Sequence, residues 1–203
     1  MQLDHIAVAG STLEEASHKV EAALGVAMQP GGRHGMFGTC NRLLGLADGI
    51  YLEAIAIDPD APAPARPRWF GLDRFSGAAR LSNWICRCGD LDETLARLPR
   101  GVGEPVGLSR GDLRWRMAVP GDGWLPFDNL FPALIEWQGR LHPGDMLAVS
   151  GCALRRLVVS HPRAGDLCDI LAPMLKDPRV VFEMGPVALW AEIETPNGMR
   201  VLE

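Results

Sequence analysis

The sequence lacks the features that would tie the chain to a membrane, to nucleic acid or to an oxidising compartment. No apolar run approaches the roughly 18 residues that a membrane-spanning helix needs, and the start, MQLDHIAVAG, is unlike a secretory signal. Basic residues number 20 against 25 acidic ones, which argues against a nucleic-acid-binding protein that relies on phosphate contacts and against a basic membrane-surface protein. Five cysteines, an odd number at irregular spacing, argue against a disulfide framework. We therefore expect a cytoplasmic protein without nucleic-acid or membrane partners.

Several catalytic signatures are missing as well. The sequence has no phosphate-cradling glycine motif, no Walker signature and no serine nucleophile elbow. What remains is the composition of a soluble globular protein, with 47% apolar and 22% charged residues. The 203 residues allow one large domain or two small ones, and they suffice to bury a core without disulfides.

The first part of the chain predicts one compact supersecondary unit. Residues 3–9 alternate like a strand, and a turn then leads into a helix whose apolar stripe ends at Gly25. A glycine-rich hairpin region and a short apolar strand over residues 50–56 follow. Residues 1–57 therefore predict the order strand, helix, strand, strand, strand.

A proline-rich segment, residues 58–80, follows this unit. Four prolines lie between positions 58 and 68, a composition that disfavours helix and central strand. We interpret the segment as a linker, with residues 58–68 exposed and extended.

Residues 81–138 repeat the first pattern. Glu14 and Glu93, near the two helix starts, are 79 positions apart, and Glu53 and Glu136 are 83 apart, which a four-residue loop insertion explains. Two copies of one βαβββ unit are the economical interpretation.

A third stretch, residues 151–203, again predicts a strand, a helix and further strands. Pro196-Asn197-Gly198 predicts a hairpin turn between the last two strands. Two alternatives stay open for this stretch, a third module or a capping extension.

Paired βαβββ units with a polar residue on the first strand and a Glu on the fourth resemble the vicinal oxygen chelate superfamily, in its glyoxalase-like branch. The resemblance implies an α+β fold in which the paired modules form a cup-shaped, incompletely closed β-barrel, with the ligand on the concave face. The motifs that carry it are Leu3-Asp4-His5, the run from His34 to Asn41, Tyr51-Leu52-Glu53, Leu125-Pro126-Phe127, Ile135-Glu136-Trp137 and His142-Pro143.

The superfamily pattern implies four positions for divalent-metal ligands, two in each unit. His5, Glu53 and Glu136 occupy three of them, and Trp84, which cannot ligate, occupies the fourth. If these positions point into the cup, Ile135 and Trp137 point outward to the second helix. The alternative is a metal-free polar pocket in which the two glutamates bind arginine side chains or water.

Other candidates have both a functional and a structural interpretation. His34 and Glu136 are the candidate catalytic residues, and Thr39 and Asn41 could donate hydrogen bonds to a bound oxyanion or could cap turns. Three further side chains would bind substrate only on the concave face: Trp84 as a pocket wall, and Arg114 with Arg116 as carboxylate ligands.

The leading functional hypothesis is a small-molecule enzyme of lyase, isomerase or dioxygenase type. A divalent metal in the cup would polarise vicinal oxygens of the substrate and stabilise an enediolate or related oxyanion. The alternative is a metal-free protein that sequesters a small molecule in the same cup, and a third possibility is a cup that has lost its site and serves in assembly. Related folds often pair units between chains, so a homodimer stays open.

Overall fold

The computed structural model describes all 203 residues, and its first unit begins with a strand at the centre of the main sheet. The helix of this unit starts where the Thr12 side chain accepts a hydrogen bond from the Glu15 N–H, and it ends at Gly25 in the left-handed conformation. The elements are β1 (Gln2–Ala9), α1 (Leu13–Leu24), β2 (Gln29–His34), β3 (Thr39–Gly45), a short 3₁₀ helix η1 (Ala47–Gly49) and β4 (Tyr51–Ile57).

The second unit repeats this order with a shorter helix, which begins where the Asp90 side chain accepts from the Glu93 N–H. None of the helices in the molecule has the length and apolarity that crossing a lipid bilayer requires. The elements of the second unit are β5 (Arg80–Arg87), α2 (Leu91–Ala96), β6 (Glu104–Arg110), β7 (Leu113–Val119) and β8 (Ala133–Gln138).

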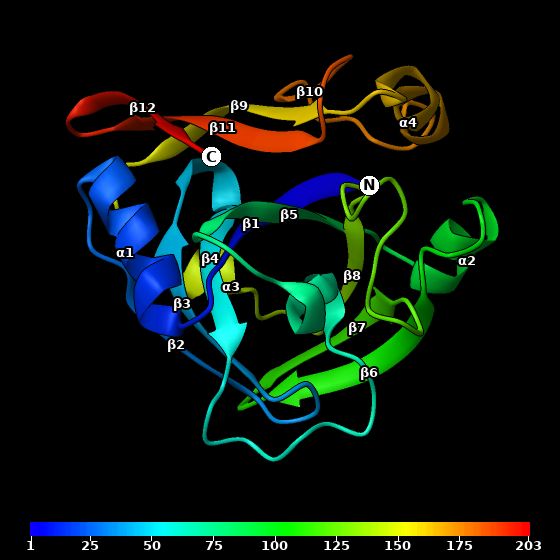
Figure 1. Cartoon of the computed structure of the whole chain (residues 1–203), viewed down its shortest axis with the longest axis horizontal. Coiled ribbons are helices and arrows are strands. Elements are labelled where there is room, and N and C mark those ends of the chain that lie inside the picture. The colour runs from blue at the N-terminus through cyan, green and yellow to red at the C-terminus, as the bar shows by residue number, and fades with distance from the viewer.

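The two units form one eight-stranded sheet in the order β2-β3-β4-β1-β5-β8-β7-β6. β1 pairs in parallel with β4, β5 pairs in parallel with β8, and the antiparallel pair of β1 and β5 joins the halves. The sheet curls so that its edge strands β2 and β6 approach each other on the side opposite β1 and β5 (Figure 1). The predicted α+β fold, a cup-shaped and incompletely closed barrel, is confirmed.

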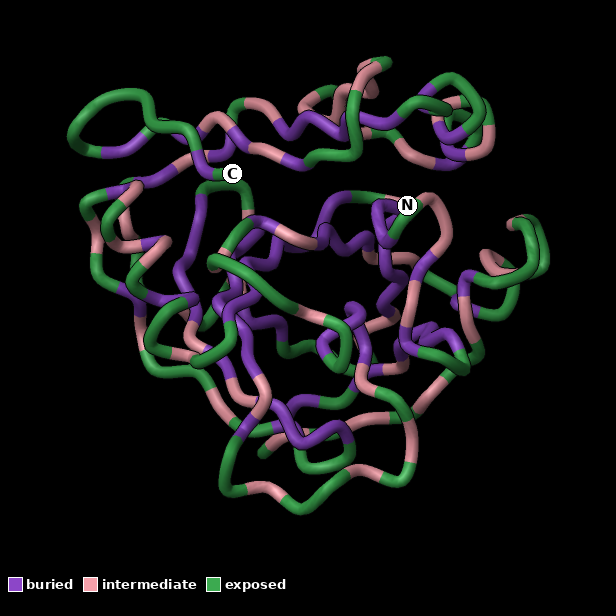
Figure 2. Tube along the Cα trace, viewed as in Figure 1, coloured by how far each residue is buried: buried purple, intermediate pink, exposed green.

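The C-terminal stretch forms a second, four-stranded sheet in the order β10-β9-β11-β12. It lies as a layer over β1 and β5, on the outside of the cup (Figure 1). One core of 46 buried apolar residues runs through both sheets, and Figure 2 shows how burial concentrates in the central strands β1, β4 and β5. The elements are β9 (Ala153–Ser160), α4 (Ala164–Leu171), β10 (Val180–Glu183), β11 (Ala188–Thr195) and β12 (Gly198–Leu202), preceded by a short helix α3 (Pro143–Met146).

The segment between the units follows the rim of the cup (Figure 1). Residues 58–68 contain no helix or strand, and they lead into the 3₁₀ helix η2 (Trp69–Arg74). Phe70 and Gly71 have φ of 60° and 67°, so the chain turns sharply here. Trp69 and Phe70 are buried, which brings two aromatic side chains of this segment into the cup.

Candidate functional site

A backbone irregularity in β1 brings two adjacent polar side chains together. Adjacent residues of a regular strand point to opposite faces, but the pairing of β1 with β5 shifts register between Leu3 and His5. The side chains of Asp4 and His5 therefore meet, and Nδ1 of His5 lies 2.6 Å from Oδ1 of Asp4. Because an ionised carboxylate only accepts, Nδ1 of His5 carries the proton.

Asp4 is fully buried and accepts hydrogen bonds from three ring side chains. Besides His5, the indole N–H of Trp137 donates to its Oδ2 at 3.0 Å, and Nε2 of His142 lies 2.9 Å from the same oxygen. Burial alone would raise the pKa of Asp4, but the hydrogen bonds and charges of His142 and His5 outweigh it and hold the pKa well below its usual range. Asp4 is thus a buried anion that orients the rings around it.

The second nitrogen of His5 faces a carboxylate. With Nδ1 directed at Asp4, Nε2 lies 3.7 Å from Oε2 of Glu53, and both side chains are buried. The His5 ring also stacks on Tyr51, with centroids 4.3 Å apart and an angle of 12° between the planes. The imidazole is therefore fixed in position and tautomer, with its free nitrogen on the cup side.

Asn41 holds the other oxygen of Glu53. Its Nδ2 donates to Oε1 of Glu53 at 2.5 Å, while its Oδ1 accepts from the Gly32 N–H at 2.7 Å and from Nη1 of Arg110 at 3.1 Å. A Cβ on Gly31 would lie 2.2 Å from Oδ1 of Asn41, yet neither glycine has a positive φ. The Gly31-Gly32 pair thus provides space for the Asn41 amide rather than an unusual backbone conformation.

His34 is neutral and has one defined tautomer. Its Nε2 lies 3.2 Å from Nη1 of Arg110 and its Nδ1 lies 3.0 Å from Oγ1 of Thr39. A guanidinium can only donate, so Nε2 accepts and Nδ1–H donates to Thr39. Burial, with added repulsion from Arg110 and His5, lowers the pKa of His34 to about 3. His34 therefore supports Arg110 as a neutral acceptor.

Aromatic side chains from both units and from η2 close the cup around these polar groups. The remaining cavity is about 30 Å³, which is room for about one water molecule. The indole N–H of Trp69 is buried without a hydrogen-bond partner. The lining side chains are His5, His34, Asn41, Leu43, Tyr51, Glu53, Trp69, Phe70, Arg110, Trp115, Met117, Ile135, Trp137 and Pro143.

The predicted position of Glu136 inside the cup is wrong. Its Oε2 accepts from the Leu91 N–H, at the start of α2, and from Nη2 of Arg116, so it lies on the outer face of β8. Ile135 and Trp137 line the cup instead. The repeat comparison misplaced β8 by one residue, and such a slip exchanges the two faces of a strand.

Three predicted substrate-binding side chains also lie away from the cup. Trp84 packs edge-on against Phe182 of β10, between the two sheets, and its indole N–H donates to the Leu130 carbonyl at 2.8 Å. Arg116 is held outside by Asp92 and Glu136. Arg114 is exposed and donates only to backbone carbonyls. By contrast, His5, Glu53, His34, Thr39 and Asn41 are brought together.

The donor set does not fit a resident divalent ion. His5 and Glu53 face each other, but Asp4 is engaged by ring N–H groups and Glu136 lies on the opposite face. No group of three His, Cys, Asp or Glu side chains in the molecule is arranged to hold a metal. A catalytic metal usually needs three protein ligands, so the predicted three-residue centre is not formed.

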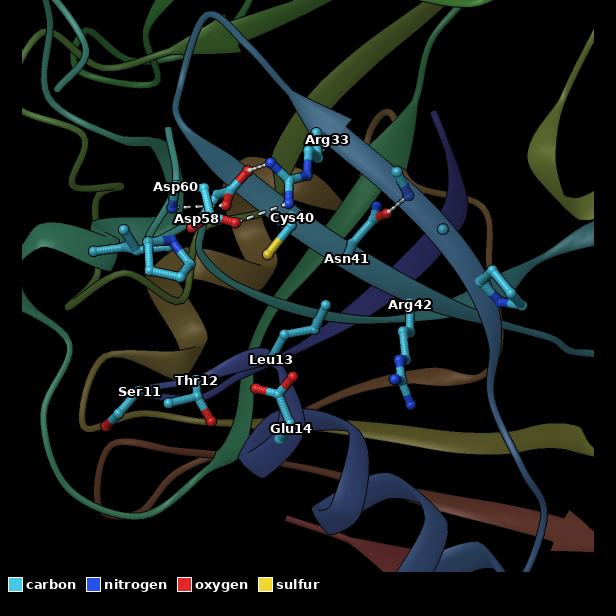
Figure 3. Close-up of a pocket in the computed structure, with 15 residues that line it drawn as sticks. Ser11, Thr12, Leu13, Glu14, Arg33, Cys40, Asn41, Arg42, Asp58 and Asp60 are labelled. Carbon is cyan, nitrogen blue, oxygen red and sulfur yellow. Dashed lines mark hydrogen bonds and ion pairs between the residues drawn. The ribbon is translucent and has the colours of Figure 1, made fainter. Parts of the chain in front are cut away.

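A wider pocket of about 450 Å³ lies outside the cup, between the start of α1 and strands β2 and β3 (Figure 3). Its charges largely neutralise one another, because Arg33 binds Asp58 at 3.2 Å and Asp60 at 3.1 Å. Asn41 lines both pockets. The arrangement indicates a solvated groove rather than a second reactive centre.

Sequence reasoning missed several residues of the cup. Arg110 comes from the far edge strand β6, and Trp69 and Phe70 come from the segment interpreted as a linker. Trp115 lies between Arg114 and Arg116, so strand alternation could have identified it once the face of β7 was known. Asp4 lies in the Leu3-Asp4-His5 motif, but only the bulge reveals its contact with His5.

Comparisons with known proteins agree with this architecture. Residues 3–175 match the family model described as a glyoxalase-like domain, and no curated protein matches the chain. Among solved structures, a hypothetical protein from Staphylococcus aureus aligns over 92% of this chain and 87% of its own at 15% identity, with a TM-score of 0.60.

Two methylmalonyl-CoA epimerase structures align over less of the chain. The enzyme from Mycobacterium tuberculosis shares 20% identity over 68% of this chain and 88% of its own, with a TM-score of 0.43. A Streptomyces coelicolor variant shares 17% identity over 69% of this chain and 95% of its own, also with a TM-score of 0.43. The family match covers most of the sequence. The chain therefore belongs to the glyoxalase-like domain family.

Proposed function

We propose that this protein is a small-molecule enzyme that transfers a proton on a substrate bound in the cup, with His5 as the general base. The observation that carries the proposal is the orientation of His5. Its Nδ1–H is held by buried Asp4, and its free Nε2 faces Glu53 across 3.7 Å. An imidazole held by a carboxylate in one tautomer is well arranged to take a proton at its other nitrogen.

The proton would come from a carbon next to a substrate carbonyl. The C–H bond breaks, an N–H bond forms at Nε2 of His5, and the electron pair moves through the new C=C bond onto the carbonyl oxygen. Asp4 stabilises the imidazolium that results through the hydrogen bond at Nδ1, and the nearby Glu53 carboxylate adds charge stabilisation. Return of the proton to carbon regenerates the base.

The cup also holds donors suited to the negative oxygen that forms. Arg110 lies in the lining with N–H groups that contact no acceptor, and the Trp69 indole N–H is buried without a partner. Such donors stabilise developing charge best in a water-poor site, and this cavity is small and buried. This is the enediolate-type chemistry expected from the family resemblance, carried by side chains of this chain alone.

The test is incorporation of deuterium from D₂O into small carbonyl compounds, followed by NMR, after dialysis against a chelator. Pyruvate and hydroxyacetone are suitable probes. Wild-type protein should accelerate exchange at the carbon next to the carbonyl, and His5→Gln should lose about 100-fold or more, the usual contribution of a general base. Glu53→Gln should also slow exchange, while His18→Gln, on the exposed face of α1, should not.

A protein that only sequesters its ligand is the second candidate, favoured by the aromatic walls of the cup. It predicts tight binding of a small molecule without exchange in wild type. Exchange that His5→Gln leaves unchanged would contradict the proposed role of His5.

A further inference from the structure

Arg110 presents a positive charge to the cup without an acidic partner. It bonds through Nη1 alone, to Nε2 of His34 at 3.2 Å and to Oδ1 of Asn41 at 3.1 Å, and both of these groups are neutral. No carboxylate pairs with it, unlike Arg33 and Arg116, which bind aspartates or a glutamate. Its Nε and Nη2 groups have no hydrogen-bond partner in the protein.

The guanidinium is held in place from the opposite edge of the sheet. Arg110 ends β6, while Gly32 and His34 belong to β2, and these edge strands approach each other across the mouth of the cup (Figure 1). A Cβ on Gly32 would lie 2.7 Å from Cδ of Arg110, so the side chain packs directly on the glycine backbone. The neutral His34 and the oriented Asn41 amide fix Nη1, which leaves the other donors free for a ligand.

Asn41 also sets the spacing between this charge and the proposed base. Its Oδ1 accepts a hydrogen bond from Arg110, and its Nδ2 donates one to Glu53, which faces His5. A single carboxamide therefore separates the cation from the Glu53 carboxylate. A ligand that reaches from Arg110 to His5 carries its anionic group only a few bonds from its reacting carbon.

We propose that Arg110 binds the carboxylate of the substrate, and that the substrate is a small 2-oxo carboxylate. The charge and free donors of Arg110 match a carboxylate, since a guanidinium can bind both oxygens. The adjacent carbonyl rests on the proposed function, because it activates the C–H bond that His5 breaks. The cavity of about 30 Å³ has room for about one water molecule, so even a three-carbon ligand must displace part of the wall, and a small substrate requires the least displacement.

The test compares pyruvate with hydroxyacetone, which has the same three-carbon skeleton without the carboxylate. Binding is followed by the fluorescence of the cup tryptophans Trp69 and Trp115 and by calorimetry. Wild type should bind pyruvate at least tenfold more tightly, Arg110→Met should remove this preference, and Arg110→Lys should restore part of it. Arg114→Met is the matched control, because Arg114 lies outside the cup and should leave the preference intact.

Equal affinity for the two probes, or a preference that survives Arg110→Met in a folded variant, would overturn the inference. The deuterium assay separates it from the proposed function. Arg110-dependent binding of pyruvate without deuterium exchange would support the carboxylate site and contradict the proton-transfer role of His5. Deuterium exchange could instead be as fast on hydroxyacetone as on pyruvate and unaffected by Arg110→Met. That result would support the proton transfer and contradict the carboxylate site.

Discussion

Individual side chains of the cup are held in one protonation state and one orientation by their neighbours. The guanidinium of Arg110 keeps Nε2 of His34 unprotonated, Asp4 fixes the proton of His5 on Nδ1, and the Gly32 N–H fixes which end of the Asn41 amide faces Glu53. Each constraint follows from donors that cannot accept or acceptors that cannot donate. The cup is therefore organised before a ligand enters, which lowers the cost of binding.

The neutral state of His34 predicts a pH dependence of stability. The unfolded chain protonates this ring below its usual pKa of 6.5, whereas the folded protein does so only near 3, so the free energy of unfolding falls as the pH drops between these values. From about pH 7 to about pH 5 the loss attributable to His34 is about 2 kcal/mol. Urea titrations of wild type and His34→Asn at both pH values measure it, and a slope that is the same in both proteins contradicts the assignment.

Protonation of Asp4 also lowers the free energy of unfolding, but at lower pH. Its folded pKa lies below the unfolded value of 3.8, so the stability it contributes is present above that value and is lost as the pH falls further. The exposed His18 gives a control, because His18→Asn should leave the acid dependence unchanged.

At the scale of elements, the η2 segment is held in the cup by a second segment in left-handed conformation. Phe127, Asp128 and Asn129 all have positive φ, between 53° and 72°. The Asn129 amide donates to the Phe70 carbonyl at 2.9 Å and accepts from the Leu125 N–H at 3.1 Å. Strained backbone of this kind persists only where the surroundings hold it, and here it positions an aromatic wall.

Asn129→Ala should loosen η2 and lower the free energy of unfolding by about 2–3 kcal/mol, because two buried hydrogen bonds are lost and alanine is strained at this φ. Asn129→Gly removes the same hydrogen bonds without the strain and should be about 1 kcal/mol less damaging. Hydrogen exchange at the Gly71 amide, which donates to the Gly123 carbonyl, should accelerate in both variants. Unchanged protection there would argue that Asn129 does not hold this segment.

The whole molecule is two sheets on one core, and Trp84 lies where they meet. It is completely buried, and its ring contacts Phe182 of the second sheet. A side chain in this position contributes to packing between layers rather than to the cup. The two sheets should accordingly unfold together.

Trp84→Ala should lower the free energy of unfolding by about 3–5 kcal/mol, the usual cost of emptying a large aromatic site. Trp84→Phe retains most of the volume and loses the hydrogen bond to Leu130, so its cost should be near 1 kcal/mol. Far-UV and near-UV circular dichroism should give one coincident transition in each protein. If Trp84→Ala instead changed ligand affinity and left stability intact, the side chain would belong to the cup after all.

The sequence alone determined the strands, the helix caps and the family. Alternation places His5, Glu53 and the apolar strand faces, Gly25 ends the first helix, and the repeated pattern indicates paired modules in a cup. These properties are local, because they depend on side chains within a few residues of one another.

Only the tertiary structure decided which residues meet in the site. The register of β8 turns Glu136 outward and Ile135 inward, the bulge in β1 joins Asp4 to His5, and the curl of the sheet brings Arg110 to His34 from 76 residues away. A one-residue shift of register exchanges the faces of a strand, and closure of a sheet pairs edges that are distant in sequence. Neither event leaves a signal in local spacing, because both are settled by packing between strands.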